Sequence, residues 1–363
     1  MNTVDFRHHL HSRLEEGTPM IATIADALSA LGIEHRTMES GSVLARIEGC
    51  RGNAERCVVL MATVDNAYGQ PCSDEDKAAS EALSCGCNDC HVAMLYGVLK
   101  QCQAKPDFEG TLFALFQPAT VDGKGGAMSV LSEDPFKGYN VAAIISQQAD
   151  SDLAVGEIGF CPGRFMPSAD ELQFAVTGMS GNAAARDRLK DSVVAMADLI
   201  VRLNAFNSDA CMLSIGRVEA LGEAMQLPEE SVCSGSMFAY DENLRSRVKD
   251  MIAHAAEEVE YKYDVEVEMS FRSIAPCVDN NTQLTYEAML QADSCGYVVR
   301  DLERQIAFND FGYYTQCYPS LYYKLGVSRA SERMHTSVAD PDERALAVGE
   351  EFMCHVALNI LNK

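Results

Sequence analysis

Short apolar runs alternate with helical segments along the first part of the chain, and this order constrains the fold more than any other feature of the sequence. Strands are predicted at 42–48, where apolar and polar residues alternate, and at 57–64, 111–116 and 141–146, which are continuous apolar runs. A helix predicted over 91–103 separates the second strand from the third. Strands that alternate with helices are typical of an α/β fold with a mostly parallel sheet, so that is the predicted fold class.

A second pattern begins after Gly163. Its elements follow the order strand, helix, strand, strand, helix, strand, with strands at 172–177, 211–220, 232–240 and 265–274 and helices at 183–203 and 242–261. This β-α-β-β-α-β order is that of the ferredoxin-like unit, which forms its own sheet with two helices on one face. We therefore predict a discontinuous α/β domain of residues 1–166 and 277–363 and an inserted ferredoxin-like domain of residues 167–276. Further helices of the first domain are predicted at 5–31, 127–131, 281–292 and 345–361.

Charge and composition narrow the functional classes. The chain has 363 residues, 47% of them hydrophobic, and a formal net charge of −24, which repels nucleic acids and anionic membrane surfaces. Residues 1–10 contain no apolar run typical of a secretion signal, and no stretch is long enough to span a bilayer. We therefore expect a cytoplasmic protein without nucleic-acid or membrane partners. The 14 cysteines are scattered irregularly, which favours reduced thiols over a disulfide framework.

The residues suited to metal chemistry are densest between Ser84 and His91, in the sequence SCGCNDCH. Thiolates, a carboxylate and an imidazole are ligands for zinc and iron, and they stand here at a predicted helix start. The candidate metal ligands are Cys85, Cys87, Asp89 and His91, with His335 from a distant segment. Two interpretations stay open, a mononuclear metal site and a turn of reduced thiols. The cysteines are closely spaced for ligands of one tetrahedral ion, and the motif lacks the second pair of ligands that a zinc ribbon has.

Several motifs spread along the chain resemble those of one known family. They are FRHHLH at 6–11, FQPA at 116–119, GEIG at 156–159, the segment 178–184, NDF at 309–311, and MHTS at 334–337 with Glu343. In their order and spacing the chain resembles the M20 family of metal-dependent peptidases and amidohydrolases, in the branch that cleaves N-acyl amino acids. The resemblance implies that the inserted domain is a lid through which a homodimer can form. It also implies a small acyl-amino-acid or peptide-like ligand.

The resemblance further implies which positions carry the family's chemistry, namely the ligands of two metal ions, a glutamate base and an oxyanion donor. In this chain the base position is Thr120, which cannot act as a base, and the carboxylate ligand that follows it is Val121, which has no lone pair. Thr63 stands where the family has an orienting aspartate, Gln148 where it has a ligand histidine, and Asn182 where it has the lid histidine. Another ligand histidine of the family falls on Asn88 or on Cys87, because the turn can be aligned in two ways.

These replacements predict that no catalytic residue of the family mechanism remains. We therefore predict an M20-type homologue that has lost dinuclear-metal amide hydrolysis, binds no cofactor and keeps its cleft for a ligand or a partner protein. The alternative is an active amidohydrolase for N-acyl amino acids or small peptides, with zinc or another divalent transition metal in a rebuilt site. Such a site would draw on Cys85, Cys87, Asp89, His91 and His335.

Overall fold

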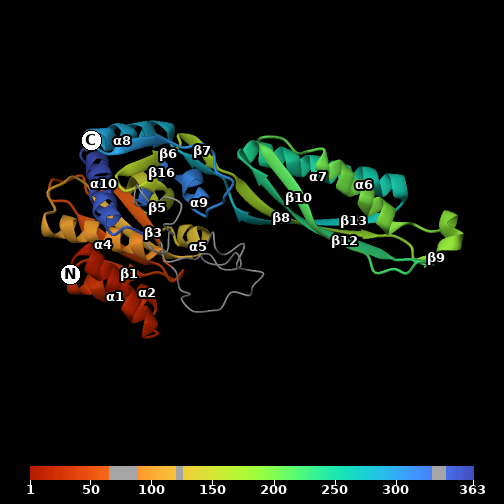
Figure 1. Ribbon diagram of the computed structural model, residues 1–363, viewed down its shortest axis with the longest axis horizontal. Coiled ribbons are helices and arrows are strands. Elements are labelled where there is room, and N and C mark those ends of the chain that lie inside the picture. Colours follow the sequence, from red (N-terminus) through yellow and green to blue (C-terminus); the bar gives the residue numbers. More distant parts are fainter. Residues whose placement is uncertain (65–87, 120–125, 329–340) are drawn as a thin grey trace. The chain divides into compact units, whose positions relative to one another are not determined.

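The computed structural model describes residues 1–64, 88–119, 126–328 and 341–363. The chain folds into two compact units (Figure 1). Unit 1 comprises Met1–Gly163, Asp279–Glu303 and Tyr313–Lys363, and unit 2 comprises Arg164–Val278 and Arg304–Gly312. Within the described ranges, none of the helices combines the length and the apolar character needed to cross a bilayer.

Unit 1 is built on an eight-stranded sheet. In spatial order its strands are β1 (Glu34–Thr37), β2 (Val43–Glu48), β4 (Thr111–Pro118), β3 (Arg56–Val64), β5 (Asn140–Ala154), β16 (Ser320–Ser328), β6 (Glu157–Phe160) and β15 (Val298–Asp301). The central strands β4, β3, β5 and β16 run parallel to one another, and β15 runs parallel to β6. Antiparallel pairs join β1 to β2, β2 to β4 and β16 to β6. This mostly parallel central sheet confirms the predicted α/β fold class.

Helices pack on the sheet of unit 1, and α4 and α10 contact its central strands β3 and β5 directly. Their apolar side chains form one core with the strands, in which Leu95 of α4 and Phe352 of α10 are fully buried. The helices of this unit are α1 (Thr3–Glu15), α2 (Met20–Ala30), α4 (Asn88–Ala104), α5 (Gly126–Ser132), α8 (Thr282–Ser294), α9 (Gly312–Cys317, at the unit boundary) and α10 (Arg344–Leu361).

Two sequence predictions for unit 1 need correction. The helical pattern over 5–31 is divided, because Gly17 takes a left-handed φ of +84° and Pro19 precedes the first residue of α2. Strand β5 extends to Ala154, beyond the predicted 141–146, and β16 was not predicted at all. Every residue of β16 is buried, so neither face shows the alternation by which a half-exposed strand is recognised.

Unit 2 contains the predicted β-α-β-β-α-β order. Its elements are β8 (Ser168–Thr177), α6 (Ser192–Asn204), β10 (Cys211–Glu219), β12 (Glu230–Ala239), α7 (Glu242–Tyr263) and β13 (Glu266–Ala275). The strands form an antiparallel sheet in the order β10-β12-β8-β13. Helices α6 and α7 pack against it and against each other, with Leu199 and Ile252 in the shared core.

Smaller elements complete unit 2 and its connections. The helix predicted over 183–203 is replaced at its start by a short 3₁₀ helix (Ala183–Arg188), and α6 begins only after Asp191, whose side chain caps it. Two short pairs are β9 (Gly181–Asn182) with β11 (Gln226–Leu227), and β7 (Gly163–Met166) with β14 (Val278–Asn280). The segment 304–312 also belongs to unit 2, although the sequence placed it in the first domain.

Candidate functional site

The carboxyl ends of the parallel strands β3, β4, β5 and β16 meet at one edge of the unit 1 sheet. Parallel sheets place their ligand-binding groups at this edge, because the loops that follow the strands converge there. In the register of the sheet Thr63 lies beside Gln117, and Gln148 lies beside Lys324. This edge therefore brings two of the family positions predicted from the sequence, Thr63 and Gln148, to neighbouring strands.

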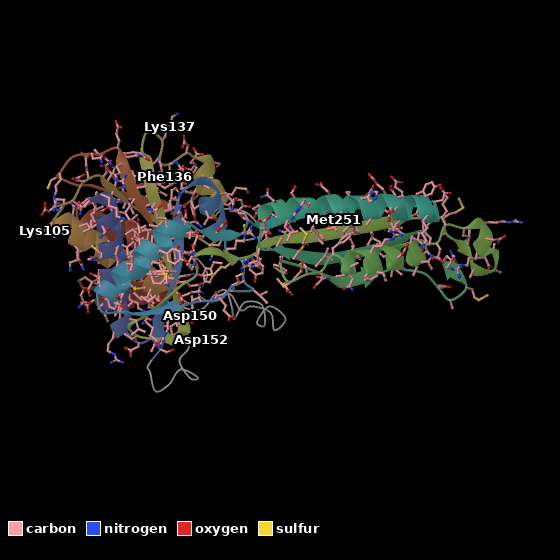
Figure 2. All side chains as sticks on the ribbon, turned by 90° about the horizontal axis from the view of Figure 1, so that it is seen from above. Lys105, Phe136, Lys137, Asp150, Asp152 and Met251 are labelled. Atoms are coloured by element: carbon pink, nitrogen blue, oxygen red, sulfur yellow. The ribbon has the colours of Figure 1, made fainter. Side chains whose placement is uncertain are left out.

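Lys324 is the buried cation of this edge. Because the residue is only 7% exposed, its ammonium group needs partners within the protein. Its Nζ donates a hydrogen bond to Oε1 of Gln148 at 2.5 Å and lies 4.0 Å from the carboxylate of Asp150. The hydroxyl of Tyr322 donates to the same Gln148 oxygen at 2.9 Å. The Gln148 amide oxygen is thus held by two donors, one of them a cation, near Asp150, which Figure 2 labels.

His91 is held as a neutral side chain beneath this edge. Its Nε2 accepts a hydrogen bond from the backbone N–H of Ala149 at 2.8 Å, so the proton of the neutral ring is on Nδ1. Burial lowers the pKa of His91 to about 4; nearby Lys324 lowers it as well, whereas Asp89 partly offsets the effect. Because the Nε2 lone pair is already bound to Ala149, this nitrogen is not available to a metal ion.

Asp89 lies in the first turn of α4 and is 1% exposed. Its Oδ2 accepts hydrogen bonds from Nε of Arg7 at 2.9 Å and from the imidazole of His11, and its Oδ1 accepts from the backbone N–H of Cys90 at 2.7 Å. A carboxylate with these three partners is compensated inside the protein. Asp89 therefore fixes the start of α4 to α1.

The FRHHLH motif acquires a structural explanation from these contacts. Arg7 and His11 hold Asp89, and Arg7 also lies 3.8 Å from Glu343, the residue that precedes α10. His8 contacts the same Glu343 at 2.5 Å. The motif thus joins α1 to the beginnings of α4 and α10. Sequence reasoning assigned no role to His11, because its partner is 78 residues away in the chain.

The remaining predicted site residues divide into two groups. Five of them lie outside the described residues, namely Cys85, Cys87, Thr120, Val121 and His335. Of the others, Asn88 is the first residue of α4 and is partly buried. Asn182 lies in unit 2, where its side chain accepts a hydrogen bond from the N–H of Ala184 at 2.9 Å and caps the 3₁₀ helix.

The ligand-type residues that the structure describes do not fit a two-metal centre. In the described ranges no group of three or more His, Cys, Asp and Glu side chains converges in a geometry suited to a metal ion. The Asp89 carboxylate is bound to Arg7 and His11, the Nε2 of His91 is bound to a backbone N–H, and the Gln148 oxygen is bound to an ammonium group. This part of the site is organised by hydrogen bonds and ion pairs within the protein.

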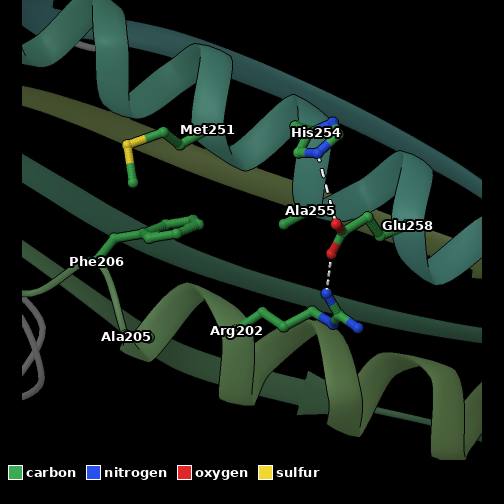
Figure 3. A pocket seen from close by; sticks show the side chains of 7 residues that line it. All are labelled: Arg202, Ala205, Phe206, Met251, His254, Ala255 and Glu258. Atoms are coloured by element: carbon green, nitrogen blue, oxygen red, sulfur yellow. Dashed lines mark hydrogen bonds and ion pairs between the residues drawn. The ribbon is translucent and has the colours of Figure 1, made fainter.

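Unit 2 has an open groove between α6 and α7 (Figure 3). Its lining side chains are Arg202, Ala205, Phe206, Met251, His254, Ala255 and Glu258. The polar groups pair with one another, because Glu258 contacts Arg202 and lies 3.5 Å from Nε2 of His254. None of the predicted site residues lines this groove, so the candidate site remains the sheet edge of unit 1.

The chain is similar in sequence to several known proteins. No family model matches it. The chain is 26% identical over 366 residues to N-acetyldiaminopimelate deacetylase of Exiguobacterium sibiricum, covering 94% of this chain and 95% of that protein. It is 26% identical over 285 residues to N-acetylcysteine deacetylase of Bacillus subtilis, covering 77% and 74%.

The fold of the chain also resembles that of a solved structure. The YXEP protein of Bacillus subtilis, described as a dinuclear metal binding peptidase of the M20 family, superposes with a TM-score of 0.78 at 22% sequence identity. The match covers 99% of this chain and 97% of that one. Both units therefore have counterparts in that structure. The chain is a homologue of the M20 peptidases and amidohydrolases, as its motifs predicted.

Proposed function

We propose that this M20 homologue has lost dinuclear-metal amide hydrolysis and that it uses the sheet edge around Gln148 and Lys324 to bind a small acyl-amino-acid or peptide-like ligand. The proposal rests mainly on one observation, the buried ammonium group of Lys324 bound to the amide of Gln148. By the family resemblance, Gln148 stands where a ligand histidine is expected. A fixed cation at such a position opposes a second cation.

Electrostatics supports this reasoning. Two unit positive charges about 4 Å apart repel each other by about 4 kcal/mol at an effective dielectric constant of roughly 20, and a divalent ion doubles this repulsion. The Gln148 oxygen that faces Lys324 is an uncharged acceptor and offers no compensating negative charge. Asp150 lies 4.0 Å from Lys324, and its single negative charge is offset by that ammonium group.

The replaced family positions point in the same direction. Thr120 cannot take a proton from water near neutral pH, Val121 cannot bind a metal, and the Asn182 side chain is engaged as a helix cap. Removing a general base typically lowers a rate by a factor of 10² to 10⁴, and removing an oxyanion donor by a factor of about 10² to 10³. Together these losses are expected to lower the rate of the inherited reaction by several orders of magnitude.

The chemistry of the edge also suggests the ligand. An ammonium group and a tyrosine hydroxyl, from Lys324 and Tyr322, suit the carboxylate that N-acyl amino acids and peptides carry. The homodimer through unit 2 and the cytoplasmic location stay predictions, which sedimentation velocity and cell fractionation can test.

A second candidate function is an active amidohydrolase that holds zinc or another divalent metal in a rebuilt site. The names of the relatives favour it, since two of them are deacetylases and a structural neighbour is a dinuclear metal binding peptidase. Its ligands would come largely from Cys85, Cys87 and His335, which lie outside the described residues.

Metal content and turnover distinguish the two functions. Protein purified without chelator is measured by inductively coupled plasma mass spectrometry and assayed with N-acetyl amino acids and dipeptides, with and without added zinc, manganese or cobalt. We expect less than about a tenth of an equivalent of any transition metal and no release of amino acid. Stoichiometric metal together with metal-dependent turnover would establish the alternative instead.

Ligand binding tests the role of Lys324. The Lys324→Met variant keeps most of the side-chain volume but removes the charge, and a hydrogen bond to a charged group contributes about 1.5–3 kcal/mol. We expect calorimetric titration with N-acetyl amino acids to show about a ten- to hundredfold weaker affinity for this variant. Lys105→Met is the control, because Lys105 is exposed and lies away from Asp150 (Figure 2). Equal affinities for K324M and the parent protein would contradict the assigned role.

A further inference from the structure

Helices α4 and α10 of unit 1 lie side by side, and two glycines allow their close approach (Figure 1). A Cβ atom added to Gly97 of α4 would overlap the carboxyl group of Glu350, and one added to Gly349 of α10 would overlap Sδ of Met94. The atoms that would be overlapped belong to side chains, so a larger residue at either position would force those side chains to move. The two glycines therefore leave room for side chains of the neighbouring helix at this interface.

The close approach brings two thiols into contact. Cys102 lies five residues after Gly97 and Cys354 five residues after Gly349, and the contact between their sulfur atoms places both thiols at the interface of α4 and α10. Their Sγ atoms are 3.9 Å apart. The residues are 2% and 9% exposed. A disulfide has a sulfur–sulfur distance of about 2.05 Å, so the two sulfur atoms must approach each other by about 1.9 Å to form the bond.

We propose that Cys102 and Cys354 are an oxidation site at which a peroxide converts the two thiols into a reversible disulfide between α4 and α10. In the first step the Cys354 thiolate attacks one peroxide oxygen, the O–O bond breaks, and Cys354 becomes a sulfenic acid while hydroxide or alkoxide leaves. In the second step the Cys102 thiolate attacks that sulfur and displaces hydroxide. Overall the two thiols lose two protons and two electrons, and the peroxide is reduced to water or to water and an alcohol.

The order of the two steps follows from the surroundings of each thiol. The two thiols form one S–H···S hydrogen bond in which either sulfur can be the donor; when Cys102 donates, the bond lowers the pKa of Cys354 and raises that of Cys102. Cys354 is also the more exposed of the two. The thiolate is the nucleophile, so Cys354 reacts with the peroxide first. The bond to Cys354 is the largest cause of the raised pKa of Cys102, so oxidation of Cys354 removes this cause and Cys102 then resolves the sulfenic acid.

Other buried thiols of the chain provide the comparison. Burial raises the pKa of Cys57 to about 12 and that of Cys233 to about 11, which makes both poor nucleophiles at neutral pH. Cys50 and Cys317 are exposed and report whether the oxidant has reached the protein. These residues supply the internal controls of the test.

Peptide mapping tests the proposal with the full chain. Reduced protein freed of reductant is treated with hydrogen peroxide, alkylated in denaturant and digested without reduction, and the peptides are identified by mass spectrometry. We expect the peptide of Cys102 linked to that of Cys354, a mass lower by two hydrogens, and full reversal by dithiothreitol. The link should be lost in C354S, with Cys102 then alkylated, and in C102S, but should form as in the parent protein in the control variant C233S.

Two outcomes would overturn the proposal. One is that Cys102 and Cys354 are both still alkylated under conditions that oxidise Cys50 and Cys317 in the same sample. The other is that either thiol is found linked to a different cysteine. The parent protein alone decides both outcomes, so a variant that fails to fold does not affect the result.

Discussion

At the scale of single residues, one hydrogen bond decides the chemistry of His91. The backbone N–H of Ala149 donates to Nε2, and the ring is fully enclosed, so a proton on Nε2 would break the bond and place a charge in the core. These two costs explain why the neutral form persists to low pH. A histidine in a family motif has thereby become a neutral acceptor that joins α4 to β5.

The low pKa of His91 predicts how the stability depends on pH. In the unfolded chain the pKa of histidine is about 6.5, whereas in the folded protein it is about 4. Above pH 6.5 neither state binds the proton; as the pH falls towards 4 only the unfolded state does, so about 3 kcal/mol of the free energy of unfolding is lost.

His91→Gln keeps an acceptor for Ala149 but cannot bind the proton, so we expect this part of the pH dependence to disappear. Urea unfolding at pH values from 7 to 4 measures it as the difference between parent and variant, which removes the contribution of the carboxylates. His254→Gln is the control, because His254 is exposed. A pH dependence in H91Q equal to that of the parent protein would refute the explanation.

The sequence identified Gln148 of the candidate site but not its partner Lys324. Gln148 was found because its spacing from the GEIG motif at 156–159 identifies it with a family position. Lys324 was missed because it lies 176 residues further along the chain, and only the parallel pairing of β5 with β16 makes the two residues neighbours. A single sequence carries no signal for such a pairing.

At the scale of elements, the contact between α1 and α4 combines a buried ion pair with apolar packing, in which Phe6 stacks on Tyr96. Arg7 is 6% exposed and Asp89 is 1% exposed, so neither charge can be satisfied by water if its partner is removed. The sequence predicted both helices, but it missed the break between α1 and α2, and it began α4 at residue 91 and not at Asn88. Glycine at 17 and proline at 19 marked that break, but the apolar periodicity across it was given more weight.

Asp89→Asn is expected to destabilise the protein by up to about 3–5 kcal/mol, because it removes the buried carboxylate bound to Arg7 and leaves that cation with the half-exposed Glu343 at 3.8 Å. Chemical unfolding at pH 7 measures the loss. The control is Asp107→Asn, which breaks the exposed ion pair between Asp107 and Arg51 and should change the stability little. Equal effects of the two substitutions would show that the buried pair contributes no more than a surface pair.

At the scale of the whole molecule, each unit has its own hydrophobic core. The core of unit 1 includes Leu60 and Phe352, and that of unit 2 includes Leu172 and Ile252. The segment 304–312 joins unit 2 through side chains, since Phe308 stacks on Phe238 with ring centroids 6.4 Å apart. Composition does not change along this segment, so the sequence offered no boundary there. Two separate cores predict that the units can lose structure independently.

Asp170 allows this independence to be tested. It lies in β8 with a fully buried side chain, accepts two hydrogen bonds of 2.7 Å from Arg245 and one of 2.8 Å from Lys249, and so compensates two cations inside unit 2. Asp170→Asn removes that compensation, at an expected cost of about 3–5 kcal/mol.

If the units unfold separately, amide hydrogen exchange followed by mass spectrometry should be at least about a hundredfold faster in D170N for peptides of β8, β12 and α7, while peptides of β3 and β5 exchange as in the parent protein. The neighbouring substitution Glu171→Gln is the control, because it disturbs an ion pair with the exposed Arg272 and a 3.4 Å hydrogen bond from the exposed Gln173, and should leave both units unchanged. Faster exchange of equal size in both units would mean that the two cores unfold together. In that case the inserted unit would not be a separately stable part of the chain, despite having a core of its own.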